Sequence, residues 1–200
     1  MELCAKFSVP LDTQALIVEC RDLFEDMWCE HVNRHAYKGQ WDVIPLRVPI
    51  QHVDSHPILQ CFAIEDEEEW CNLDVVEKMP RLRDLLNWLN TSIQSVRLMR
   101  LHPKSMISPH RDIGLCHEMG LARLHLPVSG SDSVAFWVAG YQVPMEVGQL
   151  WYINADMTHS VENQGSLARV NLVIDCKANK WLKRQIELSE VVKWKEEVAR

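Results

Sequence analysis

The feature that most constrains the fold of this chain is a succession of short, strand-like segments separated by turns. Most of them are rich in valine, isoleucine and leucine, and glycines fall in the breaks between the later ones. The segments are Val43–Val48, Ile58–Ile64, Val96–Leu101, Met106–Asp112, Ala122–Val128, Val134–Val138, Gln149–Ile153 and Arg169–Asp175. Strands this short and this closely spaced predict a mainly β fold, an antiparallel sandwich or barrel.

Three segments with helical periodicity are expected to pack outside these strands. They are Asp12–Val32, which Asp12 can cap, Pro80–Ile93 and Asn179–Arg200. The acidic run Glu65–Glu69 is expected to be an exposed loop. No repeat or flexible linker divides the chain, so we expect one domain over residues 1–200. Its expected parts are N-terminal helices and early strands (1–95), a core that carries the motifs (96–176) and a C-terminal helix (179–200).

Composition excludes several classes of partner. The net charge of −7 argues against nucleic acid and anionic membranes, because both attract basic surfaces. The seven cysteines contain no CxxC pair and are expected to be reduced thiols. Neither a signal peptide nor an apolar stretch approaching the ~20 residues of a membrane span is present. We therefore expect a soluble cytoplasmic protein.

The candidate metal ligands are His110, Asp112 and His159. In an extended strand the side chains of His110 and Asp112 point to one face, while Arg111 between them points to the other. His159 lies in a short connection between two later strands. Two imidazoles and one carboxylate can occupy one face of an octahedral iron(II) and leave three positions for other ligands. This donor set predicts a mononuclear iron site.

The HxD pattern alone is weak evidence, because composition predicts about half such a pair by chance. A second pair, His52 and Asp54, lies in a loop-like stretch between prolines, and we interpret it as structural. The tripeptide at 110–112 also matches the catalytic loop of protein kinases. A kinase needs asparagine five residues after the aspartate, where this chain has His117, and it needs a glycine-rich loop that is missing here.

Arg169 is the candidate for binding an organic anion beside the metal. On an extended strand it shares one face with Asn171 and Val173, and a cation there is costly to bury without an anionic partner. A guanidinium can hold the distal carboxylate of 2-oxoglutarate through two hydrogen bonds. The alternative is a pair with a protein carboxylate. Arg123 and His125 also share one face, and we expect them to line the cavity. The alternative is that their polar groups are hydrogen-bonded or paired within the protein.

Several of these motifs together resemble the aspartyl/asparaginyl β-hydroxylase family of 2-oxoglutarate oxygenases, over roughly residues 41–175. The motifs lie at 98–103, 107–112, 123–127, 148–155, 159–160 and 169–175. The branch most similar to this chain is that of the bacterial amino-acid hydroxylases, such as the free-proline hydroxylases. The resemblance implies a double-stranded β-helix with flanking helices. It also implies iron(II), 2-oxoglutarate and O2 as cofactor and cosubstrates.

The resemblance assigns roles to individual residues of this sequence. The implied iron ligands are His110, Asp112 and His159. Arg169 is implied to bind the distal carboxylate of 2-oxoglutarate, and Arg123 and His125 to make further contacts to it. Arg97, on a neighbouring strand, is our candidate for binding the carboxylate of the substrate. The expected reaction is hydroxylation of an unactivated C–H bond, with succinate and CO2 as co-products.

Two departures bear on the substrate. Animal members of the family lack the metal carboxylate and related halogenases replace it, so Asp112 favours the amino-acid hydroxylases. The C-terminal region is shorter than in many of those enzymes, which leaves free, peptide-bound and carrier-bound amino acids open. Two other functions remain: a non-catalytic metal-binding β-barrel, and an iron dioxygenase that does not use 2-oxoglutarate.

Overall fold

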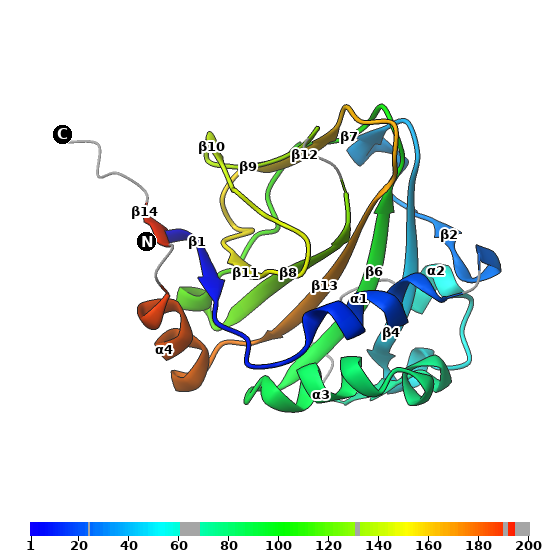
Figure 1. The fold of residues 1–200 in the computed structure, drawn as a ribbon, viewed down its shortest axis with the longest axis horizontal. Helices are drawn as coiled ribbons and strands as arrows, with labels where there is room; N and C mark the ends of the chain where they lie inside the picture. Colours follow the sequence, from blue (N-terminus) through cyan, green and yellow to red (C-terminus); the bar gives the residue numbers. More distant parts are fainter. Residues whose placement is uncertain (24, 61–68, 131–132, 190–191, 195–200) are drawn as a thin grey trace.

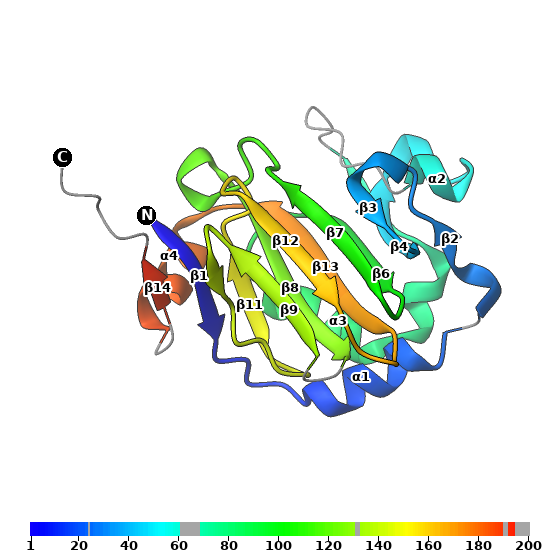
Figure 2. The same cartoon turned by 90° about the horizontal axis from the view of Figure 1, so that it is seen from above.

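The fold consists of two antiparallel sheets that face each other, with helices outside the larger sheet (Figures 1 and 2). The structure is a computed structural model, which describes residues 1–200 except 24, 61–68, 131–132, 190–191 and 195–200. The larger sheet has nine strands and the smaller has five. Along the sequence, strands of the smaller sheet alternate with strands of the larger sheet, so neither sheet is formed by one continuous stretch of the chain.

The larger sheet contains both ends of the described chain. Its strands, in spatial order, are β14 (Val192–Trp194), β1 (Glu2–Phe7), β11 (Leu150–Ile153), β8 (Leu121–Ser129), β13 (Arg169–Lys177), β6 (Ile93–Leu101), β4 (Trp41–Pro49) and β2 (Cys29–Glu30), and β5 (Trp70–Asn72) pairs with β4. The central strand β13 is buried over almost its whole length, because both faces of this sheet are covered.

The smaller sheet is formed mainly by three strands and two short edge strands. In spatial order these are β10 (Tyr141–Gln142), β9 (Val134–Val138), β12 (His159–Asn163), β7 (Ser105–His110) and β3 (Tyr37–Lys38). β12 and β7 are neighbours although about 50 residues separate them along the chain. Their pairing brings the two candidate metal-binding histidines together.

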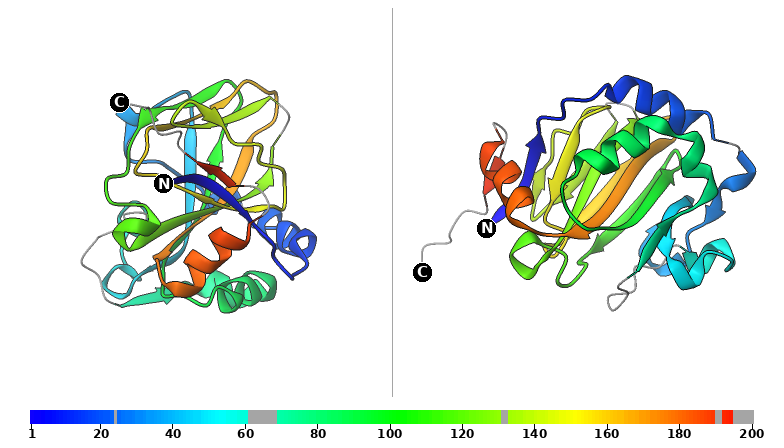
Figure 3. Two further views of the ribbon diagram at one scale, coloured as in Figure 1. Left: turned by 90° about the vertical axis from the view of Figure 1, so that its left-hand side faces the viewer. Right: turned by 90° about the horizontal axis from the view of Figure 1, so that it is seen from below.

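Helices cover the outer face of the larger sheet (Figure 3, right). They are α1 (Thr13–Arg21), α2 (Pro57–Gln60), α3 (Pro80–Trp88) and α4 (Lys180–Leu188), with 3-10 turns at Glu25–Met27, Arg34–Ala36, Ile50–His52, Asp74–Lys78 and His117–Met119. The Asp12 carboxylate accepts from the amides of Gln14 and Ala15, both at 3.1 Å, so the predicted cap is confirmed. Within the described ranges, none of these helices has the length and apolarity required to cross a membrane.

The larger sheet separates two hydrophobic clusters. On its outer face, Ile17 of α1 and Leu82 of α3 pack against buried residues of the central strands. Between the two sheets, a second cluster includes Trp41 of β4 and Phe136 of β9. Polar side chains interrupt this second cluster, and they form the site described below.

Seven of the eight predicted strands are confirmed, and the exception is Ile58–Ile64. Its first residues belong to α2, and residues 61–64 lie outside the described part of the chain. The proline at 57 explains the difference, because it favours the first turn of a helix and lacks the amide hydrogen that a strand needs. The predicted strand Met106–Asp112 ends at His110, so Asp112 follows the strand instead of lying in it. Strands β1, β2, β3, β5, β10, β12 and β14 were not predicted.

The three predicted helices exist but are shorter than their periodicity indicates. The first ends at Arg21, because the chain must turn for Cys29 to pair with Val43 of β4. The second ends at Trp88, shortly before β6 begins, and the third ends at Leu188. Six of the cysteines are free thiols, and Cys61 and most of the acidic run 65–69 lie outside the described residues.

Candidate metal centre

The two candidate histidines are direct partners across the β7–β12 ladder. His110 is the last residue of β7, His159 is the first of β12, and their ring centroids are 4.2 Å apart. The Nδ1 of His110 lies 2.8 Å from the carbonyl oxygen of Ser108, and the Nδ1 of His159 lies 3.0 Å from that of Met157. A carbonyl oxygen only accepts, so each Nδ1 carries the hydrogen. Both Nε2 lone pairs are therefore available to a metal.

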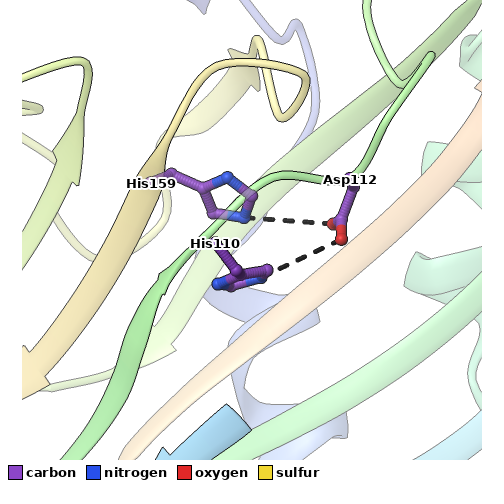
Figure 4. A group of neighbouring side chains, drawn as sticks. All are labelled: His110, Asp112 and His159. Carbon is purple, nitrogen blue, oxygen red and sulfur yellow. Dashed lines mark ion pairs between the residues drawn. The ribbon is translucent and has the colours of Figure 1, made fainter.

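Asp112 completes the set of ligands from the loop that follows β7 (Figure 4). Its amide donates to the carbonyl oxygen of Ala155 at 2.9 Å, which ties this loop to the connection before β12. Its carboxylate oxygens lie 3.9 Å from Nε2 of His110 and 3.9 Å from Nε2 of His159. All three ligand atoms lie within 4.8 Å of one another, so they can bind one ion together.

Burial keeps His159 neutral, as metal binding requires. Burial, followed by the nearby charge of His110, lowers the pKa of His159 to about 4. A neutral imidazole with its hydrogen on Nδ1 is the form that coordinates a metal through Nε2.

The other HxD pair is not part of this site. His52 lies in a 3-10 turn with its Nδ1 3.4 Å from Oγ of Ser55, and neither His52 nor Asp54 belongs to a cluster of potential ligands among the residues that the structure describes. The structural interpretation of this pair stays a prediction. A second cluster with metal-ligand side chains consists of Glu2, His117 and Glu118. In this cluster Nε2 of His117 lies at hydrogen-bond distance, 3.0 Å, from a Glu2 oxygen.

Two of the candidate ligands, His110 and His159, line a cavity of about 50 Å³ between the two sheets. Its walls are Trp41, Met99, Ile107, His110, Arg123, His125, Phe136, His159, Val161, Arg169, Asn171 and Val173. Arg169, Asn171 and Val173 therefore share one face of β13, as their alternation predicted. Arg123 and His125 also line this cavity, as predicted.

Arg169 is a buried cation without an anionic partner among the described residues. It is 5% exposed, and its Nη2 has no hydrogen-bond partner. Its guanidinium carbon lies 5.7 Å from the centroid of the Phe136 ring, and burial lowers its pKa to about 10. Both residues also line a larger neighbouring cavity of about 390 Å³. Within the part of the chain that the structure describes, no carboxylate forms the alternative pair with Arg169, so this cation is available there for a ligand.

Arg123 and Arg97 have protein partners. Arg123 donates to Asp175 through Nε at 2.7 Å and Nη2 at 3.0 Å, and its Nη1 donates to Asp112. Arg97 donates to Asp175 at 2.6 Å. Burial raises the pKa of Asp175, but the charges of Arg123 and Arg97 outweigh it and hold this pKa well below its ordinary value. The predicted roles of both arginines toward ligands remain predictions.

His125 is neutral and fixed by a neighbour. Its Nδ1 lies 2.8 Å from Nδ2 of Asn171, and burial, followed by the charges of Arg169 and Arg123, lowers its pKa well below the ordinary value. If Asn171 donates this bond, the hydrogen of His125 is on Nε2. Oδ1 of Asn171 is buried without a partner, so it too can bind a polar ligand.

Sequence reasoning gave no role to the aromatic wall of the cavity. The ring of His31 stacks on Trp41, with centroids 3.7 Å apart and planes at 12°, and the buried Nε1 of Trp41 has no hydrogen-bond partner. Burial, followed by the charges of Arg97 and Arg123, lowers the pKa of His31 to about 4. No local motif marks His31, because the stack depends on the chain returning from β2 to β4.

These two buried histidines predict how stability depends on pH. The unfolded chain binds protons on His31 and His125 below a pH of about 6.5, while the folded chain does not until the pH is much lower. The free energy of unfolding should therefore fall as pH drops from about 6.5 to about 4. Each histidine contributes up to about 1.4 kcal/mol per pH unit.

Urea unfolding of wild type and His125→Gln at about pH 7 and about pH 5 measures this slope. The variant should show a smaller loss of stability between the two conditions. An equal loss in the two proteins would contradict the assignment of His125 as a buried neutral group.

Comparison with known proteins places this site in a defined family. The family model of aspartyl/asparaginyl beta-hydroxylases matches residues 19–179. The fold is similar to viral collagen prolyl hydroxylase vCPH from Paramecium Bursaria Chlorella virus-1 (TM-score 0.51, 11% identity, 89% of this chain and 97% of that one). It is also similar to a 2OG-Fe(II) oxygenase family oxidoreductase from Burkholderia pseudomallei (TM-score 0.52, 13% identity, 81% and 76%).

A third similar structure is the non-heme alpha-ketoglutarate-dependent epimerase SnoN from nogalamycin biosynthesis (TM-score 0.54, 10% identity, 88% and 76%). These similarities confirm the predicted fold class, a mainly β double-stranded β-helix with flanking helices. Because the family model spans most of its length, the chain belongs to the aspartyl/asparaginyl beta-hydroxylase family, and it is an enzyme of the 2-oxoglutarate-dependent oxygenase class.

Proposed function

We propose that this protein is an iron(II)- and 2-oxoglutarate-dependent hydroxylase that acts on an unactivated C–H bond of an amino acid or amino-acid residue. The observation that carries the proposal is one cavity that holds two kinds of group. At one place it is lined by His110 and His159, which form the donor set together with Asp112, and at another by the buried Arg169, which has no anionic partner among the described residues. A metal site alone does not need a buried cation, whereas a metal site with a dicarboxylate cosubstrate does.

Each of these residues has a defined task in the proposed reaction. The two histidines and Asp112 hold iron(II) and leave its remaining positions open. Arg169 pairs with the distal carboxylate of 2-oxoglutarate and so sets the orientation of its other end toward the metal. When bound, iron with 2-oxoglutarate and O2 supplies the oxidising chemistry, and succinate and CO2 are released. The apolar walls from Ile107, Phe136 and Val161 exclude water from the site.

The proposed substrate class is supported by the family and by the polar groups beside the metal. The family is described as aspartyl/asparaginyl hydroxylases, and the similar viral enzyme is described as a collagen prolyl hydroxylase. Arg123 carries positive charge next to Asp112, and Arg97 shares the partner Asp175 with it, which suits a substrate with a carboxylate or a carbonyl. Arg123 and His125 remain our candidates for further contacts to the cosubstrate.

The test is succinate release with iron(II), 2-oxoglutarate and O2, over a panel of free amino acids followed by short peptides. We expect substrate-dependent succinate and a product heavier by one oxygen atom. Oxygen uptake with product but without succinate would instead indicate an iron dioxygenase that does not use 2-oxoglutarate. Metal binding without 2-oxoglutarate binding, oxygen uptake or product would indicate a non-catalytic metal-binding protein.

A further inference from the structure

Buried side chains of the larger sheet form a hydrogen-bond network that includes Asp112, one of the candidate metal ligands. Arg123 is its centre: Nε and Nη2 donate to the two oxygens of Asp175, and Nη1 donates to Oδ2 of Asp112. The side chain of Arg123 is 14% exposed and that of Asp175 is 3% exposed. A single guanidinium therefore connects a fixed carboxylate on β13 with the carboxylate proposed to bind iron.

Asp175 is held in place by its own sheet. Its Oδ2 accepts from Nη2 of Arg97 at 2.6 Å and from Oγ of Ser95 at 3.0 Å, both from β6. In the strand register Asp175 is the direct partner of Arg123 on β8. Because three adjacent strands supply these groups, the position of the Arg123 fork is fixed before any ligand binds.

Asp112 needs such a constraint more than the two histidines do. Each histidine lies in a strand and has its Nδ1 bonded to a backbone carbonyl. Asp112 lies in a loop, and its carboxylate is 32% exposed. Its amide is held by a backbone hydrogen bond, and among the described residues the hydrogen bond that orients its carboxylate comes from Arg123.

We propose that Asp175 is a positioning residue for the metal centre: it fixes Arg123, and Arg123 holds Oδ2 of Asp112 so that Oδ1 is presented to the metal. This inference rests on the proposed function. It predicts that metal affinity depends on a carboxylate that does not itself bind the ion. Hydrogen bonds to a ligating carboxylate typically change metal affinity by about 10- to 100-fold.

The experiment measures Co(II) affinity of the full chain by calorimetry, without 2-oxoglutarate, together with the Co(II) absorption spectrum. We expect Asp175→Asn to bind Co(II) about 10- to 100-fold more weakly than wild type. The loss should not exceed that of Asp112→Ala, because Asp175 acts through Asp112. Arg123→Lys keeps the charge but cannot bridge two carboxylates, and we expect it to weaken Co(II) binding by about 10-fold.

The chain offers matched controls in another bridging arginine. Arg100 on β6 donates to Asp42 through two nitrogens and to Glu25 through the third, and Asp42 is 4% exposed. Asp42→Asn and Arg100→Lys therefore disturb a similar network that does not touch the metal ligands. We expect both to lose stability but to keep wild-type Co(II) affinity and spectrum.

The outcomes separate this inference from the proposed function. If wild type fails to bind Co(II), the proposed function fails. If wild type binds but Asp175→Asn, when folded, and Arg123→Lys bind as tightly as wild type, the positioning role is wrong. It is also wrong if the two control variants lose as much affinity as the test variants. If Asp175→Asn does not fold, because Arg97 and Arg123 lose their buried counter-charge, Arg123→Lys decides the question.

Discussion

His159→Ala is expected to abolish tight metal binding and to reduce succinate release by more than about 100-fold, a loss larger than that typical of residues that only support a ligand. His159 is 6% exposed, and its Nε2 shares the site with Asp112 and His110. Alanine removes one of three ligands and leaves a gap in a wall of the cavity. Two remaining ligands do not define one face of an octahedral ion.

The measurements are Co(II) affinity by calorimetry and succinate formation in the presence of iron(II). His52→Ala is the matched control, because His52 belongs to the other HxD pair and touches Ser55 rather than the metal ligands. It should behave like wild type in both assays. If His159→Ala were as active as wild type, the assignment of the metal centre would be wrong.

Arg169→Met is expected to weaken 2-oxoglutarate binding and, at the same time, to stabilise the ligand-free protein. Loss of one partner of a buried ion pair costs about 2–5 kcal/mol of binding free energy, which corresponds to about 30-fold to several thousand-fold in Kd. In the ligand-free protein the guanidinium has no anionic partner in the described part of the chain.

The sign of the stability change follows from the pKa. Burial lowers the pKa of Arg169 to about 10 in the folded chain, so below that pH the charge destabilises the folded state by up to about 3 kcal/mol. Methionine of similar length fills the space without the charge, so the free energy of unfolding should rise at neutral pH.

Calorimetry with 2-oxoglutarate and urea unfolding without it test the two halves of this prediction. Arg184→Met is the control, since it removes the same charge from an exposed position on α4. It should change neither quantity appreciably. Unchanged 2-oxoglutarate affinity in Arg169→Met would favour a metal-binding protein without this cosubstrate, and a less stable variant would show that Arg169 serves the fold instead.

Much of the fold could be predicted because strand periodicity is a local property. Alternation along β13 placed Arg169, Asn171 and Val173 on one face before any partner strand was known, and the cavity confirms it. The first helix was predicted too long, because hydrophobic periodicity carries no information about the pairing of β2 with β4, which ends the helix early. Local preference sets which segments can form strands, and pairing with distant segments sets where they end.

For the same reason, the candidate site could be predicted from the sequence only in part. Residue type and the HxD spacing identified His110 and Asp112, and a family resemblance strengthened the choice of His159. Nothing in the local sequence indicated that Asp175 joins Arg97 and Arg123, since these residues meet only through the pairing of β6, β13 and β8. The stacking of His31 on Trp41 was missed on the same grounds.

The sequence by itself determined the mainly β class, the alternation of side chains within each strand and the chemical identity of the metal donors. Those properties depend on residue type and on neighbours a few positions away. Only the tertiary structure decided that His110 and His159 are partners across a ladder, that Arg169 is buried with no counter-ion among the described residues and that Arg123 reaches Asp112. These are contacts between segments far apart along the chain, and they form only when two sheets close over one cavity.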